Sequence, residues 1–189
     1  YQMQGYSQYQ PQGFGPSTAD GVPLSGWWRR VGATVLDSLI LAVLIGLATI
    51  PFIDTLTVGM EAWMNDLVLA AQTGAQVPSY TDAKYGLRGP LITIYVISEA
   101  VGIIYSTAML VWKSATVGQL AAGIRVVPKD QGMTQRPLPF GTALLRNVAY
   151  YALSAITITG LVNVLFPLWN RRRQTLHDMI ARTQVVKVR

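Results

Sequence analysis

Three long apolar runs dominate the pattern of hydrophobic and polar positions, over residues 31–52, 91–112 and 147–169. A helix rises 1.5 Å per residue, so about 20 apolar residues cross the roughly 30 Å of hydrocarbon in a bilayer. The first run holds one charge, Asp37, the second holds Glu99, and the third holds none. This pattern predicts an integral membrane protein in which the first two runs are full transmembrane helices.

The distribution of charge predicts which side of the membrane each segment faces. In the connection 54–90 acidic residues outnumber the two basic ones, Lys84 and Arg88, and all other basic residues lie outside it. By the positive-inside rule we expect the N-terminus, residues 113–139 and the C-terminus in the cytoplasm, with 54–90 as the extracytoplasmic loop of a plasma-membrane protein. A short amphipathic helix over 59–72 is expected on that outer side. The net charge of +6 then indicates contact with anionic lipids and not with nucleic acid.

The third apolar segment, about 141–169, conflicts with this layout. A single crossing puts the basic C-terminus outside, whereas two crossings need roughly 40 residues. An internal similarity bears on the choice, because "TVGQLAAGIRVVPK" from Thr116 and "TLHDMIARTQVVKV" from Thr175 align without gaps. Each copy reads as a short helix leading into a short strand, and two such strands can pair on one side of the membrane. The sequence leaves a single pass and a re-entrant segment open, and we favour the re-entrant one, with a break near Gly160.

The chain divides at about residue 26. Residues 1–25 are rich in Gln, Tyr, Gly and Pro and offer no apolar core, so we expect a tail that is disordered unless another subunit holds it. Its tyrosines and Phe14 are suitable anchors for such a contact. Residues 26–189 form the expected membrane domain. Its predicted fold class is all-α: a small helical bundle of two full transmembrane helices plus a third membrane-embedded segment, with short cytoplasmic helices and room for a two-stranded pairing.

Catalytic chemistry finds little support in the sequence. The chain has no cysteine and one histidine, which excludes disulfides, thiolate metal sites and a pair of histidine ligands. No nucleophile stands with a base and an orienting acid at a recognisable spacing, and no glycine-rich loop opens a helix after a strand. We therefore expect no enzyme activity, no cofactor and no metal.

Asp37 is the candidate of greatest interest, because a carboxylate in hydrocarbon costs about 2.5–3.5 kcal/mol on insertion scales. Arg30 lies seven residues earlier on the same helix face, about 10 Å away along the axis. A partner from another segment is therefore more suitable. The candidates are Arg146, Asn147 and the basic C-terminal stretch around Asp178.

These residues resemble the RDD family of membrane proteins, which is named for one arginine and two aspartates. The resemblance spans about residues 27–188, and its four signatures come in the family's order: Arg30, Ala33 and Asp37; Thr116, Gly118, Gln119, Gly123, Arg125 and Val126; Arg146 and Asn147; Asp178, Ala181, Thr183 and Val185. Gln119 stands where the family usually has lysine, so a role for that charge is not transferred. The resemblance implies a membrane protein whose molecular function is mostly unassigned, with ligand transport often suggested.

Each polar residue also has a purely structural interpretation. Arg30 can be a topology anchor whose side chain extends to the interface, and Asp37 can be a contact between helices as readily as a transport residue. Asp178 can cap a helix or pair with residues 171–173. Glu99 is not part of the family motif, and it can line a water-filled cleft or an ion path or contact a partner subunit.

Two function classes follow. In the first, the protein is an accessory subunit of a larger membrane complex, without catalysis of its own, and residues 1–25 tether it to other membrane subunits. In the second, it is a small transporter or permease that uses Asp37 and Glu99 as an ion or proton site. The sequence favours the first, because the chain has few crossings and lacks the paired halves with interrupted helices that typify secondary transporters.

Overall fold

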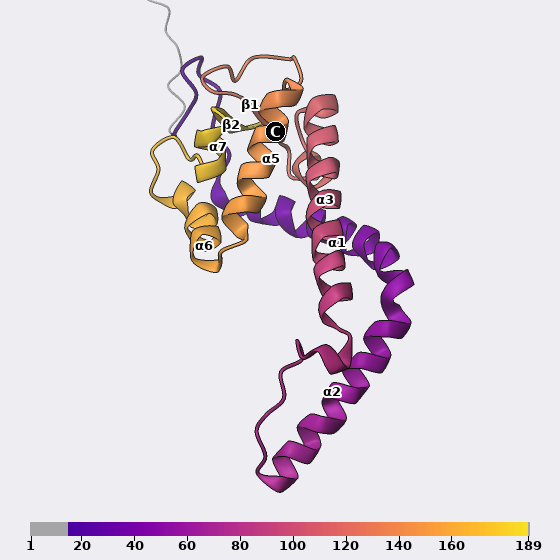
Figure 1. Cartoon of the computed structure of the whole chain (residues 1–189). Coiled ribbons are helices and arrows are strands. Elements are labelled where there is room, and N and C mark those ends of the chain that lie inside the picture. Colours follow the sequence, from indigo (N-terminus) through magenta and orange to yellow (C-terminus); the bar gives the residue numbers. More distant parts are fainter. Residues whose placement is uncertain (1–14, 189) are drawn as a thin grey trace, which may run out of the picture.

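A computed structural model describes residues 15–188, and it is mostly helical (Figure 1). Two of its helical stretches, Trp27–Thr73 and Arg88–Lys113, are long and apolar enough to cross a membrane, as predicted. The elements run in this order: α1 (Trp27–Thr49), η1 (Ile50–Phe52), α2 (Ile53–Thr73), η2 (Ala83–Tyr85), α3 (Arg88–Lys113), α4 (Val117–Ala121), β1 (Ile124–Pro128), α5 (Phe140–Ser154), α6 (Thr157–Leu165), η3 (Phe166–Leu168), α7 (Leu176–Ile180) and β2 (Thr183–Lys187).

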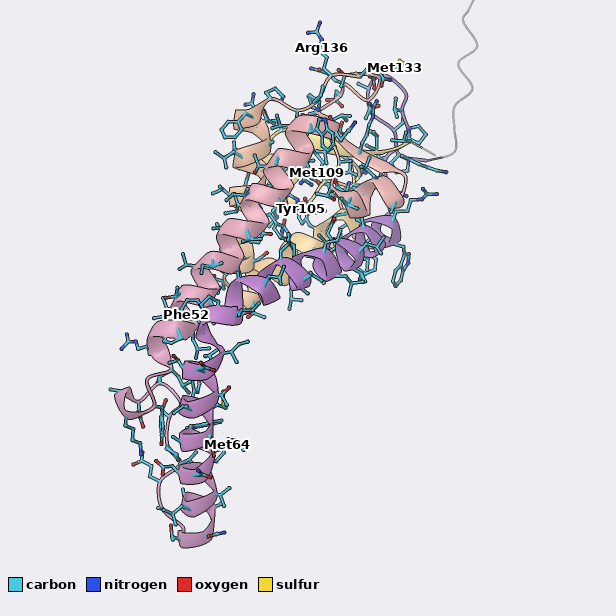
Figure 2. All side chains as sticks on the ribbon, turned by 90° about the vertical axis from the view of Figure 1, so that its right-hand side faces the viewer. Phe52, Met64, Tyr105, Met109, Met133 and Arg136 are labelled. Atoms are coloured by element: carbon cyan, nitrogen blue, oxygen red, sulfur yellow. The ribbon has the colours of Figure 1, made fainter. Side chains whose placement is uncertain are left out.

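The first apolar run does not end at Phe52, because the chain continues through η1 into α2. Pro51 lies at the start of η1, where its missing N–H costs little, so it bends the helical path without stopping it. The combined stretch has 47 residues and is about 70 Å long, more than twice the hydrocarbon thickness. Figures 1 and 2 show α2, with Met64 on it, extending away from the other elements. The predicted loop 54–90 is thus largely helix, and the predicted helix 59–72 is longer than expected.

The third apolar segment doubles back on itself. It forms α5 and α6, which lie side by side in Figure 1, joined at Ala155 and Ile156. Ile156 is extended, with φ −111° and ψ 120°, and the Thr159 hydroxyl donates to the carbonyls of Leu153 and Ile156 across the break. The break therefore lies before Gly160, and the prediction of its position was wrong by a few residues. Thr159 stabilises the turn because these two bonds tie the start of α6 to the last turn of α5.

The internal similarity is a structural repeat. Thr116 and Thr175 each cap a short helix, and each takes part in a capping box, with Gln119 in the first copy and Asp178 in the second. Each short helix is followed by a residue in the left-handed conformation just before the strand. This residue is Gly123 in the first copy and Arg182 in the second.

The strands of the two copies pair with each other. β1 and β2 are antiparallel, with Val126 opposite Val185, and both of these valines occupy the same position in the two copies. The pairing therefore has a local two-fold arrangement about this valine pair. The predicted two-stranded pairing is confirmed.

Residues 15–25 are ordered against β2, so the prediction that disorder extends to Ser25 is wrong for this part; residues 1–14 lie outside the described part of the chain. The Ser25 N–H donates to the Val185 carbonyl at 2.8 Å, and the Lys187 N–H donates to the Pro23 carbonyl at 2.9 Å. Leu24 is buried against Val186. The segment folds on its own chain because β2 presents a second edge of backbone donors and acceptors.

The core lies where α1, α3 and α5 meet the sheet, and small side chains allow the close approach of these elements. Its buried members are Ala33, Leu110, Ile124, Val126, Leu138, Ala143 and Val185. By contrast, Val35, Leu39, Val43 and Leu47 form an exposed apolar stripe on α1, which is the surface expected of a helix in contact with lipid.

Gly118 provides a test of the packing of α4 on α1. A Cβ on Gly118 would lie 2.1 Å from the Ala33 carbonyl oxygen, whereas a Cβ on Gly46, also on α1, meets nothing within 4 Å. We expect Gly118→Ala to lower the free energy of unfolding by about 1–3 kcal/mol through overpacking. Gly46→Ala is the matched control and should leave it unchanged or raise it by up to about 1 kcal/mol. Reversible unfolding in mixed micelles measures both, and equal effects would contradict the close α1–α4 contact.

Candidate functional site

Asp37 is held by the first copy of the repeat. Its Oδ1 accepts hydrogen bonds from the Tyr105 hydroxyl and from the Gly118 N–H, both at 2.8 Å, and its Oδ2 accepts one from the Thr116 hydroxyl at 2.5 Å. The expectation of a polar partner from outside its own helix is confirmed. The named candidates were wrong, however, because α3 and the start of α4 lie beside α1 and supply the donors instead.

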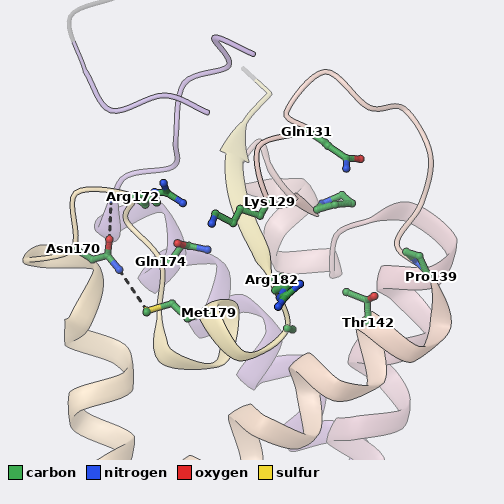
Figure 3. Close-up of a pocket in the computed structure, with 11 residues that line it drawn as sticks. Lys129, Gln131, Pro139, Thr142, Asn170, Arg172, Gln174, Met179 and Arg182 are labelled. Carbon is green, nitrogen blue, oxygen red and sulfur yellow. Dashed lines mark hydrogen bonds between the residues drawn. The ribbon is translucent and has the colours of Figure 1, made fainter. Parts of the chain in front are cut away.

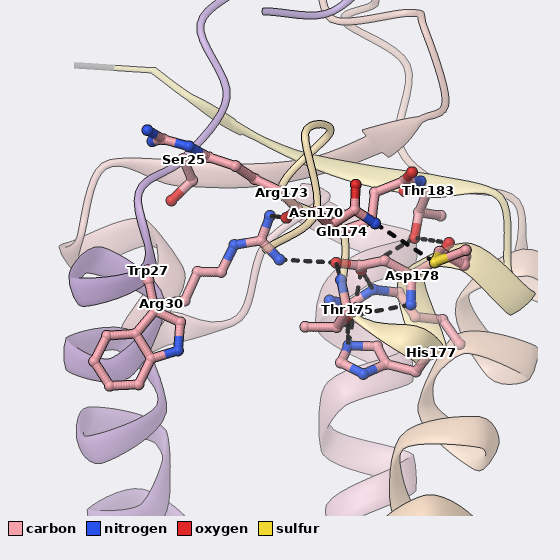
Figure 4. Close-up of polar contacts among 12 residues, drawn as sticks. Ser25, Trp27, Arg30, Asn170, Arg173, Gln174, Thr175, His177, Asp178 and Thr183 are labelled. Atoms are coloured by element: carbon pink, nitrogen blue, oxygen red, sulfur yellow. Dashed lines mark hydrogen bonds and ion pairs between the residues drawn. The ribbon is translucent and has the colours of Figure 1, made fainter. Parts of the chain in front are cut away.

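Asp178 is the centre of the second cluster, and its side chain is completely buried. Arg30 of α1 donates from Nη1 to Oδ2 at 2.8 Å, and Arg146 of α5 donates from Nε to Oδ1 at 3.0 Å. Figure 4 shows Arg30 reaching toward Asp178 while its other terminal nitrogen meets the Arg173 carbonyl. Arg30 is therefore more than a topology anchor. The predicted pairing of Asp178 with residues 171–173 is wrong, since Arg173 contributes a backbone oxygen to Arg30 and not its side chain to Asp178.

Asp178 also caps α7, as the alternative interpretation expected. Its Oδ2 accepts from the Thr175 N–H at 3.2 Å. Burial alone raises the pKa of the Asp178 carboxyl, but the charges of Arg146 and Arg30 outweigh it and hold this pKa well below its usual range. The carboxylate is thus ionised, and removing one partner of such a buried pair typically costs about 3–5 kcal/mol.

His177 lies next to this cluster and is neutral at pH 7. Burial is the main cause that lowers the pKa of His177 to about 3, and the charge of the nearby Arg146 acts in the same direction. Its Nδ1 lies 3.0 Å from the Asn163 side-chain oxygen, which can only accept, so Nδ1 carries the proton. Its Nε2 then accepts from the Thr175 hydroxyl at 3.1 Å. Sequence reasoning missed His177 and Asn163, although an asparagine in the middle of an apolar run was a usable signal.

The remaining predicted residues support these clusters or lie apart from them. Asn147 donates to the Thr107 hydroxyl at 3.0 Å and so joins α5 to α3. Arg125 donates to the Gly132 carbonyl at 2.9 Å and fixes the loop that follows β1. Glu99 is half-buried on α3, and no hydrogen bond or ion pair joins it to Asp37 within residues 15–188. Across that same range, no cluster of acidic and histidine side chains is suited to a metal ion.

A cavity of about 290 Å³ lies between α1, α5 and the two short helices. Its polar lining includes Arg30, Arg146, His177 and Gln119, and Asp37 lines it as well. Its walls include apolar side chains of α1 and α6, namely Val31, Val35, Leu41 and Val164. Both family aspartate clusters therefore border one amphipathic cavity.

A second and larger hollow of about 880 Å³ is lined by residues of the loop between β1 and α5 and by residues around α7 (Figure 3). Three basic side chains, Lys129, Arg172 and Arg182, line this hollow. They are exposed, and Arg172 lies 3.9 Å from the Asp130 carboxylate. The hollow is a basic surface and is separate from the cavity between the helices.

Comparison with known proteins gives a family and distant relatives. The model of the RDD family matches residues 24–182. The chain is 28% identical over 165 residues to the proline-rich antigen of Mycobacterium leprae (strain TN), covering 83% of this chain and 58% of that protein. It is 26% identical over 173 residues to the proline-rich antigen homolog of Mycobacterium tuberculosis (strain CDC 1551 / Oshkosh), covering 86% and 62% respectively. The chain thus spans less than two thirds of the length of these relatives. No solved structure matches it.

His177 predicts how stability depends on pH, and it is the only histidine in the chain. Its pKa is about 3 in the folded protein and about 6.5 in the unfolded chain. Between pH 3 and pH 6.5, the unfolded chain therefore binds one more proton than the folded protein does. Stability should therefore fall by about 1.4 kcal/mol per unit as the pH drops from about 6.5 toward 4.5. The Asp178 contribution is lost only at lower pH and does not interfere. Reversible unfolding of the wild type and of His177→Gln checks this, and the variant should lack the slope; the same slope in both proteins would contradict a buried neutral His177.

Proposed function

The chain belongs to the RDD family of membrane proteins, and we propose that it works as a non-catalytic subunit bound to other membrane proteins. The observation that carries this proposal is the α2 arm, defined as residues 53–73. A helix that leaves the body of the protein and the hydrocarbon needs another surface for its apolar side chains.

The α2 arm has one covered face and an uncovered remainder. Gly59 and Ala70 are buried against the returning segment, and the Trp63 indole donates to the Pro78 carbonyl at 3.1 Å. The other side of the helix exposes Ile53, Met60, Met64 and Val68, each by at least 42% of its surface. These residues recur at about one helical turn and form a single stripe. Contiguous exposed apolar surface of this kind is typical of an interaction site, and methionine adapts well to a protein partner.

Transport is the second candidate, and the cavity between the helices supports it. The arrangement of Asp37 and Glu99, the two carboxylates that the transport hypothesis requires, argues against this candidate. Asp37 is engaged by three hydrogen-bond donors, and within residues 15–188 no bond links it to Glu99. A cation or proton would have to displace the donors that hold α4 on α1. This engagement favours a structural role for Asp37.

The subunit proposal predicts that one side of α2 is essential for association. Met64→Glu adds a charge to the apolar stripe, and Asn65→Glu adds the same charge to the neighbouring exposed position outside that stripe. Both should fold, because both positions are exposed. Met64→Glu should reduce the partner proteins that co-purify from native membranes at least tenfold, because burying an unpaired carboxylate in an interface costs several kcal/mol. Asn65→Glu should retain them.

Quantitative mass spectrometry of the purified material measures this difference. Equal recovery of partners with Met64→Glu and Asn65→Glu would contradict the role of the arm. A wild-type protein that stays a single chain in mild detergent, and moves solute in liposomes, would favour transport instead.

The proposed orientation is the plasma membrane with the sheet in the cytoplasm and the α2 arm outside, supported by the distribution of basic residues. The Cys-free chain permits single-cysteine labelling at Gln76 and at Lys187, which are both exposed. Val185 is unsuitable because only 1% of its surface is exposed. A membrane-impermeant maleimide should label Gln76→Cys in intact cells and Lys187→Cys only after permeabilisation. The reverse pattern would overturn the orientation.

A further inference from the structure

Two arginines that line the cavity carry more positive charge than the buried carboxylate they share neutralises. Arg30 and Arg146 both bind Asp178, which supplies a single negative charge. His177 adds no charge at neutral pH. The cluster of Arg30, Arg146 and Asp178 therefore carries one net positive charge in a buried place, where an uncompensated charge is costly.

Arg146 also has hydrogen-bond donors to spare. Its side chain is only 9% exposed, and it lines the cavity. Its Nε donates to Asp178, but within residues 15–188 no acceptor binds its two terminal nitrogens. These nitrogens are not among the buried side-chain atoms that lack a partner, so they border accessible space. A guanidinium edge of this type fits the two oxygens of a phosphate or carboxylate group.

Gln119 provides a second free donor at the same cavity. Its side-chain oxygen accepts from the Thr116 N–H at 3.0 Å to close the capping box, which leaves its amide nitrogen to donate. Gln119 lines the cavity together with Arg146. Asp37 also lines it, but its oxygens are taken by Tyr105, Thr116 and Gly118. Gln119 is linked to Asp37 through Thr116, so an anion held by Arg146 and Gln119 is attracted by the two arginines and repelled by the Asp37 carboxylate.

We propose that this cavity binds a phosphate-type oxyanion, with the terminal nitrogens of Arg146 and the amide of Gln119 as its donors. The volume of about 290 Å³ is at the lower limit of ligand pockets and suits a small anion or a head group, not a whole lipid. The apolar walls suit the first carbons of an attached chain. The ligand is thus free phosphate or the head group of an anionic phospholipid, and the binding chemistry is the same for both.

The test uses the full-length protein in phosphatidylcholine nanodiscs. Calorimetry measures binding of inorganic phosphate, and native mass spectrometry measures retention of phosphatidylglycerol against phosphatidylcholine. Gln119→Glu keeps the capping oxygen, which a glutamate supplies equally well at this position, and puts a negative charge into the cavity. Gln131→Glu is the matched control, because Gln131 lines the basic surface hollow instead.

The wild type should bind phosphate or selectively retain phosphatidylglycerol, and Gln119→Glu should lower that affinity at least tenfold, as expected for losing a hydrogen bond to a charged group and adding repulsion. Gln131→Glu should bind as the wild type does. Retention of the lipid without binding of phosphate identifies a head-group site, and phosphate binding that displaces the lipid identifies a general oxyanion site. No selective binding to the wild type overturns the proposal, and so does a loss of binding in Gln131→Glu with none in Gln119→Glu.

Discussion

The buried carboxylate of Asp178 joins three segments that are far apart in the sequence. It caps α7 through the Thr175 N–H, binds α1 through Arg30 and binds α5 through Arg146. A buried carboxylate of this kind is stable only when its cationic partners are in place, because the ion pairs, and not apolar packing, offset the free energy of its desolvation. The contact therefore requires the chain after the doubled-back segment to return to the start of α1. This return fixes β2 beside β1 and brings the two copies of the repeat together.

The repeat explains why the family aspartates have different environments. In both copies a threonine caps a short helix that leads into a strand, with Gln119 and Asp178 in the same capping position. The first copy has no carboxylate of its own. It is attached to α1 by the carboxylate of Asp37, which accepts a hydrogen bond from the Thr116 hydroxyl. The second copy carries its carboxylate itself and receives cations from α1 and α5. In the first copy the surrounding helix supplies the negative group, and in the second copy the surrounding helices supply the positive groups. The cavity lined by Arg30 and Arg146 lies between the two copies and these helices.

The cavity and the α2 arm are separated along the molecule, so the two proposals are physically independent. The arm offers apolar side chains on a helix that has left the bundle, and its affinity for a partner depends on burial. The cavity offers charge-assisted hydrogen bonds from Arg146, whose side chain is only 9% exposed, and such bonds are stronger there than at the surface. A partner bound to the arm and an oxyanion bound in the cavity would act through different forces, and one can be removed without the other.

The sequence by itself predicted a membrane protein, two helices long and apolar enough to cross a membrane, the pairing of the repeated segments and the family. Each of these depends on local hydrophobic periodicity or on a motif of fixed spacing. Both can be read from neighbouring residues without knowing which other segments pack against them. It failed for the partners of Asp37 and Asp178 and for residues 15–25. Those depend on which backbone groups and side chains arrive from elsewhere, as Gly118 does for Asp37 and as β2 does for Leu24. Only the tertiary structure decides such contacts, because a carboxylate or a strand edge accepts many partners and the fold selects the one that lies within about 3 Å.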